Sequence, residues 1–293
     1  MSTPNERVRN LSFWHEPVRP EPLGGGITNV NFTVNHRGER FVVRVGDDIP
    51  VHQVMRFNER AASEAAFRAG ISPEVVHAEP GIMVIRFITG KTLTGDDVRA
   101  PQTLARILPL IRRVHTDMPG EVRGPALVFW VFHVLRDYGH TLRDGASRHL
   151  PRLPELLAIA EQLEREVGPV EMVYGHNDLL PANFIDDGAR IWLIDWDYAG
   201  FNSPLFDLAN LASNNDLSVE QEAWMLEAYY GKPPTSELKR SYSAMKCASL
   251  LRETLWSMVS EVHSKLAFDY PAYTADYLGR FERALVAHST GSF

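Results

Sequence analysis

The chain has 293 residues, of which 44% are apolar and 23% charged, as in ordinary globular proteins, and this length favours two lobes over a single core. A net charge of −7 argues against a nucleic-acid surface, and the single cysteine, Cys247, excludes an internal disulfide or a CxxC metal site. The opening segment MSTPNERVRN lacks the apolar core of a signal peptide, and no apolar run reaches membrane-spanning length, so we expect a cytoplasmic protein without a membrane span.

Residues 1–90 predict a small, mostly antiparallel β lobe with one main helix. In chain order, the predicted elements are a leader to about residue 22, strands near 31–34 and 41–45, a helix over 53–69 and a strand over 81–88. Phe13 and Trp14 of the leader are expected to pack on this lobe. The turn 36–39 joins the first two strands in a hairpin, and Gly70 is well placed to cap the helix.

Apolar residues beyond Gly90 recur with helical spacing and predict a larger, mainly helical lobe over residues 91–293. Thr94 with Asp97 three residues later is typical of a helix start. The predicted helices cover one stretch from Thr94 past Val114 and about 126–144, 154–167, 204–214, 218–229, 236–265 and 271–288. The segments VEMVYG and NFIDDGARIWLID predict three short strands, the last two joined by a hairpin turn. The expected fold class is therefore α+β.

Two polar segments of the large lobe carry the chemistry. HNDLLPAN supplies His176, Asp178 and Asn183, and IDWDYAG, where an apolar strand ends, supplies Asp195 and Asp197. Kinase-type phosphoryl transfer requires a base that aligns an attacking hydroxyl, together with an amide and a carboxylate that hold magnesium. The alternative is that these are only turn residues, since Asn, Asp and Pro favour loops. Two carboxylates beside strand ends favour a cation site.

The chain resembles the choline and ethanolamine kinases, within the larger aminoglycoside phosphotransferase group that shares the protein-kinase-like fold. HNDLLPAN, IDWDYAGFN and FDLAN are similar to that family's catalytic and metal-binding segments. LGGGITNVNFTV is similar to its glycine loop, RFNERAASEAAFRAGISPEV to its helix C region and LWSMVSEVHSKLAFDYPAY to its C-terminal substrate segment. This resemblance runs from about Leu23 to Phe281. It implies a bilobal fold, with a nucleotide-binding β lobe over 1–90 and a helical lobe over 91–293 that carries the catalytic loop and the acceptor site.

The glycine segment is expected to cover nucleotide phosphates. It precedes a strand rather than a helix and no GKS or GKT follows, which disfavours the Walker and Rossmann loops. Backbone without side chains can approach oxyanions closely, although a merely flexible turn is the alternative. The expected nucleotide contacts are Gly24, Gly25, Gly26, Thr28 and Asn29, with Phe87 and Ile88 from the strand over 81–88.

A cation that grips the phosphates must be an arginine, because no lysine precedes Lys91. Arg44 is central in the strand after the glycine hairpin, and its guanidinium can hold two phosphate oxygens at once. A surface strand charge is the alternative. By analogy with the lysine and glutamate pair of kinases, Glu59 is expected to fix Arg44 when nucleotide is absent, with Glu64 as the fallback.

The catalytic loop is expected to use three of its groups directly. Asp178 would accept or orient the hydroxyl proton of the acceptor, while Asn183 and Asp195 would bind magnesium. His176 is expected to brace the loop rather than carry protons. Asp207 in FDLAN is also expected to brace it, with an ordinary helix N-terminal charge as the alternative.

An amine-bearing acceptor needs an aromatic face, a carboxylate or both. Trp256 falls beside the apolar stripe of its helix, which favours a site role over a mere extension of the core. Choline kinases often show two tryptophans one turn apart here, but this chain has Glu253 where the first would stand. This difference favours ethanolamine or another amine, and the alternative is an entirely different acceptor. The expected acceptor wall comprises Asp197, Tyr198, Glu253, Trp256, Phe268, Tyr270 and Tyr273.

The leading hypothesis is an ATP- and Mg²⁺-dependent phosphotransferase that acts on the hydroxyl of a small amino alcohol. A kinase of the same fold acting on an aminoglycoside, thiamine or a sugar derivative is the second. A nucleotide-binding module without turnover is disfavoured because Asp178, Asn183 and Asp195 are all present. The sequence leaves ATP versus GTP, the oligomeric state and the pathway open.

Overall fold

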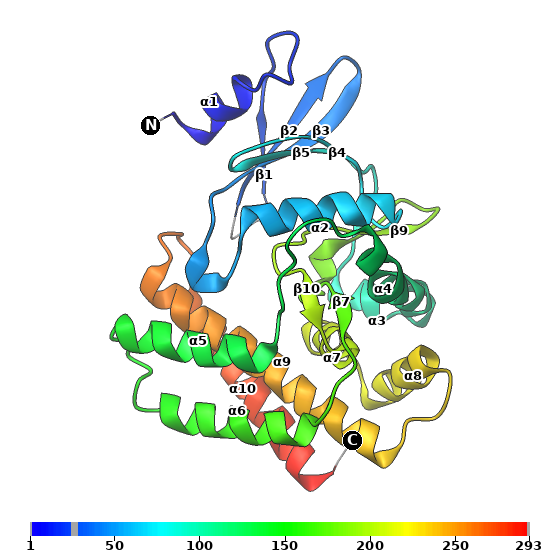
Figure 1. Ribbon diagram of the computed structural model, residues 1–293, viewed down its shortest axis with the longest axis vertical. Helices are drawn as coiled ribbons and strands as arrows, with labels where there is room; N and C mark the ends of the chain where they lie inside the picture. The colour runs from blue at the N-terminus through cyan, green and yellow to red at the C-terminus, as the bar shows by residue number, and fades with distance from the viewer. Residues whose placement is uncertain (1, 25–28, 292–293) are drawn as a thin grey trace.

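The computed structural model describes residues 2–24 and 29–291, with a small β lobe above a larger helical body (Figure 1). The small lobe is a five-stranded antiparallel sheet in the order β1-β2-β3-β5-β4, and α2 lies between this sheet and the body. Its elements are α1 (Pro4–Arg9), β1 (Glu21–Leu23), β2 (Val30–His36), β3 (Glu39–Val45), the 3₁₀ helix η1 (Pro50–His52), α2 (Arg56–Arg68), β4 (Val75–Glu79) and β5 (Ile82–Arg86).

The central hairpin of the sheet follows from its turn residues. Strands β2 and β3 pair in register up to His36 opposite Glu39. Arg37 and Gly38 between them both adopt positive φ, 53° and 79°. A two-residue turn with left-handed backbone matches the twist of antiparallel strands, so the predicted hairpin is confirmed.

The leader packs on this sheet as expected. The rings of Phe13 and Trp14 lie 5.6 and 5.8 Å from the ring of Phe41 on β3. The indole N–H of Trp14 donates to the carbonyl of Val8 at 2.7 Å, which fixes the turn after α1. The leader itself contains α1 and β1, and neither was predicted.

Helix α2 starts at Arg56 rather than at Gln53. The reason is local, because Gln53 has a positive φ of 60° and Val54 forms an isolated β-bridge with Ile49. Gly70, with φ 68°, follows the end of the helix and caps it as predicted.

The body is built around α9, which packs against α5, α6, α7 and α10. Cys247 on α9 is buried, as expected for a structural thiol. Two small sheets, β10-β7 and β6-β8-β9, complete the body. Its elements are β6 (Lys91–Thr92), α3 (Gly95–Arg99), α4 (Pro101–Glu121), α5 (Val131–Asp144), α6 (Leu153–Val167), β7 (Val173–Gly175), the 3₁₀ helix η2 (Pro181–Asn183), β8 (Phe184–Asp186), β9 (Ile191–Leu193), β10 (Gly200–Asn202), α7 (Pro204–Asn214), α8 (Val219–Tyr230), α9 (Ser236–His263) and α10 (Tyr270–Thr290).

Two helices of the body differ from their predictions. The first predicted helix divides into α3 and α4, because Ala100 is extended and Pro101 begins a new helix. Helix α5 begins at Val131, later than predicted, because the preceding segment runs along β10. There the N–H of Phe129 donates to the carbonyl of Phe201 at 2.9 Å.

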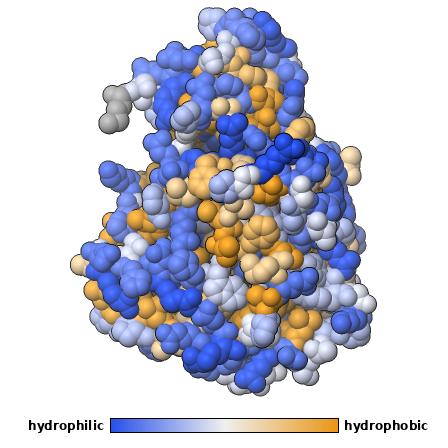
Figure 2. Space-filling view, in the orientation of Figure 1, coloured by the Kyte–Doolittle hydropathy of each residue, from blue (hydrophilic) through white to orange (hydrophobic). Residues whose placement is uncertain are grey.

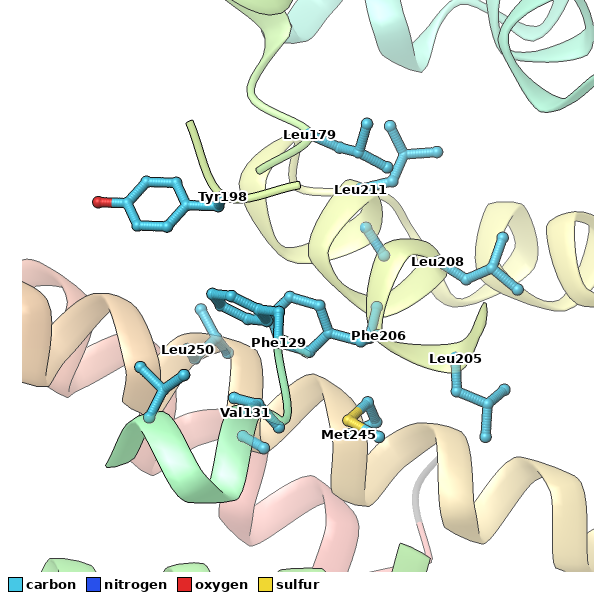
Figure 3. Close-up of a cluster of buried hydrophobic side chains, with 14 of the residues drawn as sticks. Phe129, Val131, Leu179, Tyr198, Leu205, Phe206, Leu208, Leu211, Met245 and Leu250 are labelled. Carbon is cyan, nitrogen blue, oxygen red and sulfur yellow. The ribbon is translucent and has the colours of Figure 1, made fainter. Parts of the chain in front are cut away.

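A hydrophobic cluster fixes the catalytic segment to α7. The rings of Phe129 and Phe206 lie 5.3 Å apart, and Leu179 of the HNDLLPAN segment is fully buried. Figure 3 shows Leu179 beside Leu211 of α7, and Tyr198 near Phe129 with its hydroxyl pointing away from the cluster. The chain therefore anchors one side of the catalytic segment in the core while the other side remains available for chemistry.

Hydrophilic side chains cover much of the surface, and hydrophobic ones gather in the middle of the face shown in Figure 2, below the level of α2. Within the described part of the chain, no helix is both long enough and apolar enough to cross a bilayer.

Candidate active site

The catalytic loop between β7 and η2 is held rigidly by Asp207. The carboxylate of Asp207 accepts the backbone N–H groups of His176 and Asn177 at 2.8 and 2.7 Å, and the ring of His115 lies 3.0 Å away. The fully buried His176 ring contacts the carbonyl of Ile194 at 2.9 Å, which joins the loop to the segment before Asp195. This arrangement agrees with the bracing roles expected for His176 and Asp207.

Asn183 and Asp195 lie next to each other and offer oxygen ligands. The N–H of Ile194 donates to the carbonyl of Asn183 at 3.0 Å, so the two segments meet directly before Asp195. The amide NH₂ of Asn183 donates to the carbonyl of Asp178 at 2.8 Å, which leaves its Oδ1 for another partner. An amide oxygen beside a carboxylate suits Mg²⁺, which prefers oxygen ligands and keeps several waters. These residues therefore fit the expected metal site.

Arg44 joins the small lobe to this site. Its Nη2 donates to Asp195 Oδ1 at 2.9 Å, and its Nε forms an ion pair with Glu59 Oε1 at 2.9 Å. Glu59 on α2 is thus the partner, as expected, whereas the fallback Glu64 pairs with Arg60 at 2.8 Å. Arg44 is largely buried, so its alternative role as a surface strand charge does not fit.

A second arginine, Arg56, belongs to the same network and was missed in the sequence. Its Nη1 donates to Glu59 Oε2 at 2.6 Å and to Asp197 Oδ1 at 2.9 Å. Its spacing to Glu59 on α2 was the only available signal, since Asp197 lies far along the chain. The result is a largely buried network of two arginines and three carboxylates between the lobes, in which only Asp195 is substantially exposed.

Asp197 differs from its expected place in the acceptor wall. Its Oδ1 accepts from Arg44 and Arg56, and its Oδ2 accepts from Asn29 Nδ2 at 3.4 Å. Both oxygens therefore face the small lobe, because two guanidinium groups compete for this carboxylate.

A cleft of about 300 Å³ opens beside Asn183 and Asp195. Its lining combines apolar side chains from the sheet, which suit a nucleotide base, with Arg44, Asn183 and Asp195, whose polar groups suit phosphates and a cation. The lining includes Leu23, Gly24, Asn31, Val42, Arg44, Val75, Ile85, Phe87, Ile88, Asn183, Ile185 and Asp195. Gly24, Phe87 and Ile88 thus lie where nucleotide contacts were expected, whereas Gly25, Gly26 and Thr28 lie outside the described residues.

The pKa values of the Asp178 and Asp195 carboxyl groups are shifted in opposite directions. Burial raises the pKa of Asp178 well above its ordinary value, and the cation of Arg252 is the strongest opposing influence. Burial acts on Asp195 too, but Arg44 outweighs it and holds the pKa of that carboxyl below its ordinary value. A carboxyl with a raised pKa suits proton transfer, whereas an acidic one suits metal binding.

The acceptor side is an aromatic group from α9 and α10 packed against Tyr198. The indole N–H of Trp256 donates to the Tyr198 hydroxyl at 3.0 Å. The Trp256 ring lies 6.0 Å from those of Tyr270 and Tyr273. The Tyr273 hydroxyl donates to Glu253 Oε2 at 3.3 Å, which brings this carboxylate to the same place. The aromatic residues expected in the acceptor wall, together with Glu253, are therefore brought together.

Arg252 lies directly beside Asp178 and was not assigned a role from the sequence. Its Nη1 contacts the carboxylate of Glu253 and lies 3.8 Å from Asp178 Oδ1. Its guanidinium stacks 4.2 Å from the centre of the Tyr198 ring. Glu253 is consequently paired with a cation of this chain, which the spacing of residues on one helix could not reveal.

The chain is similar to known proteins over most of its length. The chain matches the choline/ethanolamine kinase family model over residues 21–243. Protein LicA of Haemophilus influenzae is 28% identical over 269 residues, which cover 88% of this chain and 78% of LicA. Ethanolamine kinase 2 of Mus musculus is 26% identical over 290 residues, which cover 88% of this chain and 74% of that protein.

Solved structures agree as well. The crystal structure of a choline/ethanolamine kinase family protein from Mesorhizobium loti superposes with a TM-score of 0.78 at 25% identity, covering 96% of this chain and 93% of that one. Aminoglycoside phosphotransferases share the fold at lower identity. The chain thus belongs to the choline/ethanolamine kinase family, which comprises small-molecule kinases with the bilobal protein-kinase-like fold.

Proposed function

We propose that this protein transfers the γ-phosphate of ATP, with Mg²⁺, to the hydroxyl of a small amino alcohol of the choline or ethanolamine type. One observation carries the proposal. The amide of Asn183 donates to the backbone carbonyl of Asp178 at 2.8 Å, and Asp195, which follows the segment bonded to Asn183, contacts Arg44 in the lining of the cleft. This arrangement supports a base, two metal ligands and a phosphate-binding cation acting together.

In the proposed reaction Asp178 orients the acceptor hydroxyl and takes its proton as the oxygen attacks the γ-phosphorus in line. The bond between that phosphorus and the β–γ bridging oxygen breaks, and ADP leaves with the electron pair. Arg44 neutralises phosphate oxygens, and Glu59 holds its guanidinium in place. Asn183 and Asp195 would hold the Mg²⁺, which would supply the remaining charge neutralisation. The protein contributes mainly positioning, and the reaction belongs to the cytoplasm, where ATP is available.

The aromatic wall supports an amine-bearing acceptor. An ammonium group is attracted to the faces of aromatic rings. The rings of Tyr270 and Tyr273 each lie 6.0 Å from the indole ring of Trp256. Glu253, which accepts from the Tyr273 hydroxyl and also pairs with Arg252, brings a carboxylate next to the same rings. An acceptor with both an amine and a hydroxyl fits this combination of groups.

The decisive experiment is ADP release from ATP and Mg²⁺ with choline, ethanolamine, thiamine and kanamycin as separate acceptors. We expect turnover with an amino alcohol, loss of activity with a metal chelator, and a kcat for Asp178→Asn reduced by about a hundredfold to ten-thousandfold. Asp144→Asn, on the exposed end of α5, is the matched control and should keep the parent rate. Turnover confined to kanamycin or thiamine, or an Asp178→Asn enzyme within a few-fold of the parent, would contradict the proposal.

A further inference from the structure

The buried guanidinium of Arg252 has one edge without a partner. Its side chain is 2% exposed, and Nη1 is occupied by Glu253 and lies near Asp178. Nε and Nη2 make no hydrogen bond with any described residue. Nε and Nη2 form the side edge of an arginine, where two N–H groups point in parallel. This is the edge that binds a carboxylate through two hydrogen bonds.

A second unpartnered donor lies in the same region. The hydroxyl of Tyr138 on α5 is fully buried and likewise lacks a hydrogen-bond partner among the described residues. Burial raises the pKa of Tyr138, and the Arg252 cation opposes the rise, so the two groups are electrostatic neighbours. His52, which contacts Trp256 at 5.2 Å between ring centres, lies 5.9 Å from the Tyr138 ring. The unpaired donors therefore border the acceptor wall.

The unpaired N–H groups of Arg252 and the hydroxyl of Tyr138 could be satisfied by a ligand that accepts hydrogen bonds. A buried donor left unpaired costs free energy, and a charged one costs more, so a fitting acceptor gains affinity by satisfying it. An ammonium group can only donate and cannot pair with Arg252 or with the hydrogen of Tyr138. The amine of the substrate must instead face the aromatic rings or a carboxylate. The edge of Arg252 remains for an oxyanion on the same molecule.

We propose that the acceptor is a zwitterionic hydroxy amino acid, which is an amino alcohol that also carries a carboxylate. Its carboxylate binds the Nε and Nη2 edge of Arg252. This inference rests on the proposed function. Arg252 is then a specificity-determining residue. The phosphoryl group still passes from ATP to the hydroxyl, the hydroxyl proton passes to Asp178, and the products are ADP and the O-phosphorylated amino acid.

The test uses pairs of acceptors that differ only by the carboxylate. Serine is compared with ethanolamine, and homoserine with 3-aminopropan-1-ol, by ADP release from the full chain with ATP and Mg²⁺. We expect kcat/KM to favour the carboxylate-bearing member of at least one pair by about tenfold or more, because a site that pairs a charged group discriminates strongly against its absence. A parent enzyme that prefers the carboxylate-free member of both pairs would overturn the inference.

Variants of Arg252 separate this role from others. In Arg252→Met, kcat/KM should fall at least tenfold more for the carboxylate-bearing acceptor than for its partner, and Arg252→Lys should restore part of the preference. Arg240→Met, on the exposed start of the same helix, should change neither. An equal loss for both members would indicate that Arg252 holds the transferred phosphoryl group or the fold, and would reject the inference. If Arg252→Met does not fold, the preference of the parent enzyme still decides.

The two proposals fail in different ways. Turnover with ethanolamine but with neither serine nor homoserine would reject the carboxylate while the amino-alcohol kinase stands. Absence of turnover with all four acceptors and with choline would reject the proposed function itself.

Discussion

Arg44 Nη2 lies 2.9 Å from Asp195 Oδ1, so a cation of the β lobe is bonded directly to a carboxylate of the helical body. The same guanidinium reaches Glu59 on α2, 2.9 Å from its Nε. The charge of Arg44 is therefore neutralised by one carboxylate from each lobe, and a nucleotide phosphate that binds Arg44 as we propose would replace one of these contacts. The same contacts join the two lobes.

We predict that Arg44→Lys raises the KM for ATP by about tenfold, which corresponds to about 1.4 kcal/mol. Lysine keeps the charge but is a point donor, so it cannot hold Glu59 on one edge and Asp195 or a phosphate on another. Steady-state kinetics with varied ATP would measure the change. Arg60→Lys, on α2 directly after Glu59 and paired with Glu64, is the control and should leave KM unaltered. Equal KM values for Arg44→Lys and the parent would show that the two-edged guanidinium of Arg44 is not required for ATP binding.

Local signals explain which parts of the fold could be predicted. The hairpin after β2 and the cap at Gly70 depend on residues close in sequence, and both appeared as expected. Strand β4 was missed because all its residues are half-buried, which removes the alternation that marks a strand. Strand β10 has only three residues and exists through its pairing with β7. Strands that are stabilised by pairing with segments distant in the sequence are poorly indicated by the local residue pattern.

The site shows the same division. Asp178, Asn183 and Asp195 could be assembled from motif spacing because their segments are consecutive in the chain. The placement of Asp197 could not, since its partner Arg56 lies 141 residues away and captures the carboxylate for the small lobe. Arg252 escaped for a related reason, because what distinguishes it is an unsatisfied edge in a buried setting. Where several side chains could make the same contact, the folded structure is needed to identify the one that does.

The hydrogen bonds that the Asp207 carboxylate accepts, called the Asp207 clamp, should be essential for the stability of the catalytic loop. We predict that Asp207→Ala lowers the free energy of unfolding by about 3 kcal/mol, because two backbone N–H groups and His115 would lose a buried charged partner. Asp207→Asn retains one acceptor oxygen and should lose less. Urea denaturation would measure both. Asp144→Ala, on the exposed end of α5, should remain within about 0.5 kcal/mol of the parent. A loss of that small size for Asp207→Ala would contradict the clamp.

His52 should make the fold sensitive to acid. Its ring is buried between Tyr138 and Trp256 and contacts the Ser260 hydroxyl at 3.0 Å. Burial, with help from Arg252 and His263, lowers the pKa of His52 from 6.5 to about 3. The neutral ring is therefore favoured in the folded state, and its contribution to stability is complete above pH 6.5. As pH falls from 6.5 towards 3, the unfolded chain binds a proton that the folded chain does not.

The resulting prediction is quantitative. Between pH 7.5 and pH 5, His52 alone should lower the free energy of unfolding by about 2 kcal/mol. His52→Gln has no ring to protonate, so its loss of stability over the same interval should be smaller than that of the parent by about this amount. Other histidines, including the buried His176, are present in both proteins and cancel in the difference. Urea denaturation of both proteins at the two pH values measures it, and parallel losses would show that the His52 ring accepts a proton in the folded state.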